Sequence, residues 1–203
     1  MEITLILLVV IAAWQLLRVR YQRTHIALLG QHLAGMQLER HMETLTQGYT
    51  RAIREESEAR QLQVLDTFAQ TERAVAAQVQ SLATAMQKES APAASMSVLS
   101  FCVPNVERFL PSLARDFREL LHVHAKGLRH VVDNTDQWDA KTRAYHLSAE
   151  LYLLQHSCHW FCKSRAVADA RLMLRHQVNH QKVLDSVSVV TRSAYLQWRQ
   201  GRR

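Results

Sequence analysis

The sequence predicts an all-α protein in three parts: a single N-terminal transmembrane helix, a long helical stalk and a C-terminal helical bundle. The chain opens on an uncharged apolar run, and its middle repeats apolar residues at intervals of three and four. Helix breakers are scarce, with 5 Gly and 3 Pro in 203 residues, and the first proline is Pro92. We place the parts at residues 1–20, 21–90 and 98–203, with a linker at 91–97.

The apolar run Ile3–Leu17 is interpreted as a membrane anchor. As a helix it covers roughly 22 Å, short of the ~30 Å hydrocarbon core, so flanking residues must complete the span. A cleaved signal peptide would need a positive start and a small-residue cleavage site, and a buried core helix is the other alternative. Because Arg18, Arg20 and Arg23 follow the run and no cation precedes it, we expect the N-terminus outside and the rest cytoplasmic.

The excess positive charge lies in the C-terminal half. Residues 1–97 carry 9 basic and 9 acidic side chains, whereas residues 98–203 carry 16 and 9. A basic domain beside a bilayer has two natural anionic partners, nucleic acid and the anionic lipid surface, and charge does not choose between them. In a reducing cytoplasm the three cysteines, Cys102, Cys158 and Cys162, are expected to be free thiols.

The middle segment carries apolar stripes with the spacing of a packing helix. The stripes comprise Leu38, Met42, Leu45, Tyr49 and Ala52, then Leu65, Phe68, Val75, Val79, Leu82 and Met86, with Glu72 as a polar interruption. We expect 22–90 to form one long helix, kinked near a glycine, or two helices folded on each other. The stripe would pack on another copy of the chain, which we favour because anchors align copies in parallel, or on the chain's own C-terminal domain.

The C-terminal half reads as an up-and-down bundle of three or four helices. A small, polar, proline-bearing stretch at 89–97 precedes it and predicts a domain boundary. Caps and breakers suggest the helix ends: starts near Pro104 and Pro111, a stop at 133–136, a second helix from Trp138, and a last helix that begins at Ser164 or Asp169 and ends at Gly201.

Two pairs of metal-binding residue types lie four positions apart late in this bundle: Cys158 with Cys162, and His176 with His180. They could hold zinc between neighbouring helices. The pairs come level only if the intervening turn is centred on Asp169, because a turn at 163–164 leaves them roughly 15 Å out of register. We therefore favour thiols packed in the core and expect no metal and no other cofactor.

The stretch Arg175-His176-Gln177-Val178-Asn179-His180 offers a second chemistry. An arginine and a histidine suffice for metal-independent RNA cleavage: the imidazole moves a proton, the guanidinium holds the developing negative charge, and the ribose hydroxyl attacks. The spacing itself is not specific, since Arg171 with His176 fits as well. A histidine satisfied within the core or an interface is the alternative interpretation.

Arg175–His180 resembles the signature of the HEPN superfamily, with His176 and Asn179 in the stretch between the catalytic Arg175 and His180. The layout is similar to the small membrane-anchored accessory proteins of RNA-targeting type VI CRISPR systems. The resemblance implies a bacterial inner-membrane protein that assembles as a homo-oligomer, ring or pore, acts in antiviral defence and has RNA or an RNA-guided effector complex as partner. In HEPN ribonucleases two protomers complete one active site, whereas in the membrane-anchored type the motif diverges, so ribonuclease activity is left open. The alternative is a membrane-tethered coiled-coil scaffold whose basic domain docks on protein or lipid.

Overall fold

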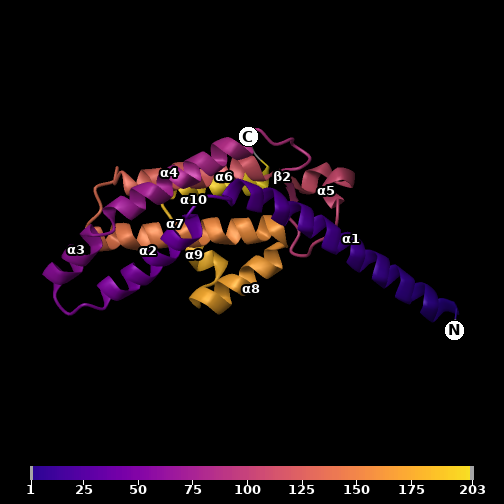
Figure 1. Ribbon diagram of the computed structural model, residues 1–203, viewed down its shortest axis with the longest axis horizontal. Coiled ribbons are helices and arrows are strands. Elements are labelled where there is room, and N and C mark those ends of the chain that lie inside the picture. The colour runs from indigo at the N-terminus through magenta and orange to yellow at the C-terminus, as the bar shows by residue number, and fades with distance from the viewer. Residues whose placement is uncertain (1, 202–203) are drawn as a thin grey trace.

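Helices make up nearly all the regular structure of residues 2–201, which the computed structural model describes, and the all-α fold class is confirmed (Figure 1). Two three-residue strands and one 3₁₀ turn complete this part of the chain. In chain order the elements are α1 (Glu2–Leu33), α2 (Leu38–Ile53), α3 (Glu58–Asp66), α4 (Ala69–Met86), β1 (Ser95–Ser97), α5 (Val106–Phe109), η1 (Pro111–Leu113), β2 (Ala114–Asp116), α6 (Phe117–Val132), α7 (Ala140–Cys162), α8 (Arg165–His176), α9 (His180–Ser186) and α10 (Val189–Gln200).

Helix α1 is one uninterrupted helix of 32 residues that lies in two different surroundings. Its first half projects away from the body of the molecule, as Figure 1 shows at the lower right. Its second half packs on α4 and α7 and buries Gln22, His25 and Leu29. The helix ends just before Gly35, which has a φ of +84°, a left-handed conformation that glycine adopts without a steric cost.

The extended stalk expected over 21–90 is not observed among the described residues. The chain breaks after α1, α2 and α3, and α2 to α4 fold back onto α6 and α7. The stripe residues Leu45, Tyr49, Val79 and Leu82 are buried within one chain. Of the two partners considered for the stripe, the chain's own C-terminal half is therefore the one that covers it.

The segment expected to be a linker is built into the fold. Ala94 and Met96 are buried, and β1 pairs with β2 in an antiparallel register that sets Met96 opposite Arg115. One apolar core runs from Leu29 of α1 to Trp198 of α10. Residues 22–201 thus share a single core, and no domain boundary falls at 91–97.

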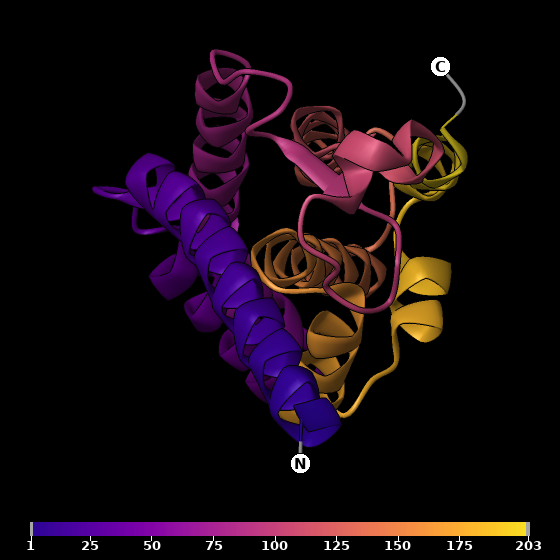
Figure 2. The same cartoon turned by 90° about the vertical axis from the view of Figure 1, so that its right-hand side faces the viewer.

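Helix α7 lies at the centre, with α1, α2 and α4 on one side and the C-terminal helices on the other (Figure 2). The Asp139 side chain caps its first turn by accepting hydrogen bonds from the backbone N–H groups of Lys141 and Thr142. The single last helix expected before Gly201 is in fact three. Ser164 caps α8, as one of the two alternatives proposed, and Gln177 ends it in a left-handed conformation, with a φ of +54°.

Candidate functional site

The first half of α1 is a candidate membrane anchor. α1 is the one described helix that is long and apolar enough to cross a bilayer, and none of its most apolar 18-residue window is buried. The exposed fraction of Ile3 is 76% and that of Leu8 is 60%. A core helix of a soluble protein would bury these side chains, so that alternative does not fit the structure.

The break at Gln177 divides the motif Arg175–His180 between two helices. Arg175 and His176 form the last turn of α8, and His180 is the first residue of α9. The Asn179 side chain is engaged locally, because its Oδ1 accepts the N–H of Lys182 at 2.8 Å and so caps α9. The expectation of a single last helix running through these residues was therefore wrong.

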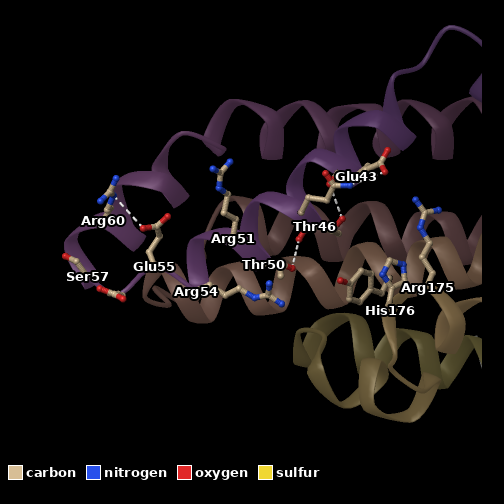
Figure 3. Close-up of a pocket in the computed structure, with 13 residues that line it drawn as sticks. Glu43, Thr46, Thr50, Arg51, Arg54, Glu55, Ser57, Arg60, Arg175 and His176 are labelled. Atoms are coloured by element: carbon tan, nitrogen blue, oxygen red, sulfur yellow. Dashed lines mark hydrogen bonds and ion pairs between the residues drawn. The ribbon is translucent and has the colours of Figure 1, made fainter.

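Arg175 and His176 face a large cleft between α2–α3 and α7–α8 (Figure 3). Its volume is about 930 Å³, and Arg51, Arg54 and Arg60 line it as well. The His176 ring stacks on Tyr152 with centroids 4.0 Å apart, and its Nε2 lies 2.9 Å from Gln155 Oε1. Partial burial, followed by the charge of Arg175, lowers the pKa of His176.

The cleft carries acidic residues beside its arginines, namely Glu43, Glu55 and Glu56. Arg60 Nε lies 3.6 Å from the Glu55 carboxylate, so at least one of the cations is already matched. This mixture of charges gives a polar cleft with a small positive excess. It is suited to a ligand that carries one or two negative groups, and it is a weaker attractor for a long polyanion.

His180 belongs to a separate cavity of about 350 Å³. Its Nε2 lies 3.0 Å from the Tyr195 hydroxyl oxygen, and its ring centroid lies 4.4 Å from that of His156. His156 is fully buried, and its Nε2 donates to Asp169 Oδ1 at 2.8 Å. Two imidazoles, a phenol and a carboxylate therefore meet where α7, α8, α9 and α10 converge.

The surroundings of His180 favour its neutral form. Burial, and then the neighbouring His156, lower its pKa to about 4. The hydrogen bond from His156 holds the pKa of Asp169 below its usual range, so this carboxylate is ionised at neutral pH. A neutral His180 can accept a proton, although a pKa this low makes it a weak base.

Two arginines that the sequence did not single out share the His180 cavity, Arg165 at the start of α8 and Arg199 at the end of α10. These two arginines place a cation beside the cavity of His180, the position that the sequence had suggested for Arg175. Arg165 is hydrogen-bonded through Nη2 to the Ser100 hydroxyl. Nothing local in the sequence predicts this grouping, because it depends on the turns at 163–164 and 177–179 and on the return of α10.

Cys158 and Cys162 do not lie together with both His176 and His180, as a shared zinc site would require. The turn between α7 and α8 falls at Lys163 and Ser164, the position that puts the two pairs out of register. Cys158 and Cys162 line an apolar pocket together with His176, and this pocket adjoins the cleft lined by Arg51, Arg54, Arg60 and Arg175, which we call the arginine cleft. His180 lies in the separate cavity that it shares with Tyr195. Burial raises the pKa of Cys162 to about 11, so its thiol is protonated. Within residues 2–201 no three His, Cys, Asp or Glu side chains are grouped so as to hold a metal ion.

Comparison with family models, with curated proteins and with solved structures finds no match to this chain.

Proposed function

We propose that this chain is a single-pass membrane protein whose helical body is held against the cytoplasmic face of a bacterial inner membrane, where it acts as an effector or accessory domain. One observation carries the proposal: a single helix is wholly unburied over its apolar first half and built into the core over its second. A helix with these two halves needs an apolar solvent for one and a folded body for the other.

The orientation is inferred from the flanking charges. Arg18, Arg20 and Arg23 lie directly after the apolar stretch, and Arg20 and Arg23 are exposed on α1. Positive residues beside a span favour the cytoplasmic side. In this orientation the body, with its arginine cleft and its His180 cavity, lies in the cytoplasm.

Assembly into a ring or pore, and a role in antiviral defence, are proposed from the resemblance of Arg175–His180 to the HEPN signature. The apolar stripe of residues 38–86 gives this part of the proposal no support, because the chain's own C-terminal half covers it. An oligomer would therefore form through other surfaces, and a coiled-coil scaffold built on this stripe has no support for the same reason.

Metal-independent RNA cleavage is the second candidate, favoured by the grouping of His180 with Arg165 and Arg199 in one cavity. It predicts that His180→Ala and Arg199→Ala each lower cleavage of a single-stranded RNA at least 100-fold. Arg175→Ala leaves cleavage unchanged if the work is done within one chain, and abolishes it if a second copy brings Arg175 to the cavity. An equal rate of cleavage by the wild type and by His180→Ala removes this candidate.

The main proposal is tested by carbonate extraction of membranes from cells that express the full-length chain. The wild type should stay in the membrane pellet, whereas Leu8→Arg with Ile11→Arg should move to the supernatant, because two central arginines are costly in a span. Both side chains are exposed, so the fold should be unaffected. A wild-type protein that carbonate releases would contradict membrane anchoring.

The orientation needs a second readout. A protease added to inverted inner-membrane vesicles should digest the body, and the same protease added to spheroplasts should leave it intact. The reverse pattern would overturn the cytoplasmic assignment and leave the anchor itself standing.

A further inference from the structure

Two phenylalanines are exposed in the segment 98–113, which connects β1 to β2. The exposed fraction of Phe101 is 76%, that of Phe109 is 80%, and that of the adjacent Leu110 is 51%. The chain has 5 phenylalanines, and Phe117 and Phe161 are buried in the core. We call Phe101, Phe109 and Leu110 the apolar loop patch.

The apolar loop patch lies beside the point where α1 leaves the body. The Tyr21 hydroxyl donates to Glu107 Oε1 at 3.0 Å, which ties α5 to α1. Glu107 is itself buried, with an exposed fraction of 8%. Figure 1 shows α5 on the side of the body from which the free part of α1 projects.

A second contact places the other end of the loop at the same level. Gln22 and Arg18 lie close enough to the Cys102 thiol to influence its pKa, although burial is the larger effect and raises it. Cys102 follows Phe101 directly. Residues 18–22 lie within about 8 Å of the end of the apolar stretch along the helix axis. Phe101 is one position from Cys102, and Phe109 is two positions from Glu107, the two loop residues next to this part of α1.

Exposed aromatic side chains at this level meet the boundary between headgroups and acyl chains. Rings of this kind bury their apolar surface there, and nearby arginines meet lipid phosphates. Arg108, next to Phe109, and Arg18 and Arg20 of α1 supply such charge in the sequence.

We propose that the apolar loop patch is a second membrane contact, in which Phe101, Phe109 and Leu110 insert into the bilayer surface beside α1. The contact rests on the proposed anchoring by α1. The span and the loop together hold the body in one tilt and one rotation, because two separated contacts leave no free rotation about the axis of α1.

The experiment uses the full-length chain with benzoylphenylalanine, a photoreactive analogue of phenylalanine, at one position. The chain is reconstituted in nanodiscs of phosphatidylcholine and phosphatidylglycerol, irradiated and examined by mass spectrometry. The probe at Phe109, and in a second variant at Phe101, should form lipid adducts. The matched control is Leu174 near the end of α8, which is 84% exposed but outside the loop. We expect at least tenfold more lipid adduct at Phe109 than at Leu174.

A third probe at Leu8 in the span separates the two proposals. Lipid adducts at Leu8 but none at Phe109 or Phe101 would overturn the second contact and leave the anchor intact. No lipid adduct at Leu8 would overturn the anchor and the loop contact together. Crosslinking of Phe109 to another copy of the chain, in place of lipid, would assign the apolar loop patch to a protein interface and refute the proposal.

Discussion

The buried carboxylate of Glu72 joins three helices that the sequence places far apart. Glu72 of α4 accepts a hydrogen bond from the Tyr49 hydroxyl of α2, and its other oxygen accepts from Arg143 Nη1 of α7 at 2.6 Å. The exposed fraction of Glu72 is 2%. This network stabilises the packing of α2 and α4 on α7, so the substitution Glu72→Ala tests whether residues 38–86 fold back on the C-terminal half.

Removing one partner of a buried ion pair costs about 3–5 kcal/mol, because the other charge stays buried without compensation. The Arg143 side chain keeps 18% of its surface exposed, so we expect Glu72→Ala to cost about 3 kcal/mol. For a chain of this size such a loss lowers the melting temperature by roughly 6–12 °C. Circular dichroism of the full-length chain in a mild detergent measures the melting temperature directly.

The control is Glu58→Ala on α3, where the carboxylate is exposed and a change within about 0.5 kcal/mol is expected. In the double variant Glu72→Ala with Arg143→Ala, the loss should be smaller than the sum of the single losses, because the two side chains interact directly. If Glu72→Ala melted no lower than Glu58→Ala, Glu72 would be in water, and residues 38–86 would form the free stalk that the sequence suggested.

Three further outcomes are expected. Burial raises the pKa of Glu150 to about 7, so between pH 4.5 and pH 7 the folded chain holds a proton that the unfolded chain releases, and this group's contribution to stability is lost as pH rises. In urea unfolding, the stability of Glu150→Gln relative to the wild type should therefore rise by up to roughly 3 kcal/mol from pH 4.5 to pH 7. A difference in stability that stays constant with pH would contradict the burial of this carboxyl group. Gly127→Ala should cost about 1–3 kcal/mol in the same assay, because the new Cβ would lie 1.9 Å from Thr191 Oγ1, whereas an unchanged midpoint would show that α6 and α10 are not so closely packed. Gln177→Gly should raise the melting temperature, because glycine adopts the left-handed conformation without strain, whereas in a continuous helix the same change would cost about 1 kcal/mol and lower it.

Local features of the sequence predicted the helical class and many helix ends. The scarcity of glycine and proline indicated helices throughout, Ser164 was one of two caps proposed for α8, and Gly201 ends α10 with a φ of +70°. A long apolar N-terminal helix was predictable for the same reason, since fifteen consecutive uncharged residues favour an apolar environment. Each of these signals lies within a few residues of the feature it controls.

The packing of residues 38–86 was not predictable, because their apolar stripe indicates only that another apolar surface must cover it. The same spacing of Leu45, Tyr49, Val79 and Leu82 serves a second copy of the chain or the chain's own α6 and α7. Glu72 was the one informative residue, since a carboxylate in an apolar stripe needs a cation. Its partner Arg143 is 71 positions away, and no short-range pattern connects them.

The turn inside Arg175–His180 shows that a short motif specifies residue types and not their positions in space. On one continuous helix Arg175 and His180 would lie about 140° apart around the axis and about 7.5 Å apart along it. In the structure the left-handed Gln177 and the cap at Asn179 turn the chain between them. Arg175 then lines the cleft shared with α2, and His180 lines the cavity shared with α10. Within one chain His180 therefore shares its cavity with Arg165 and Arg199, and Arg175 lies in a different cavity.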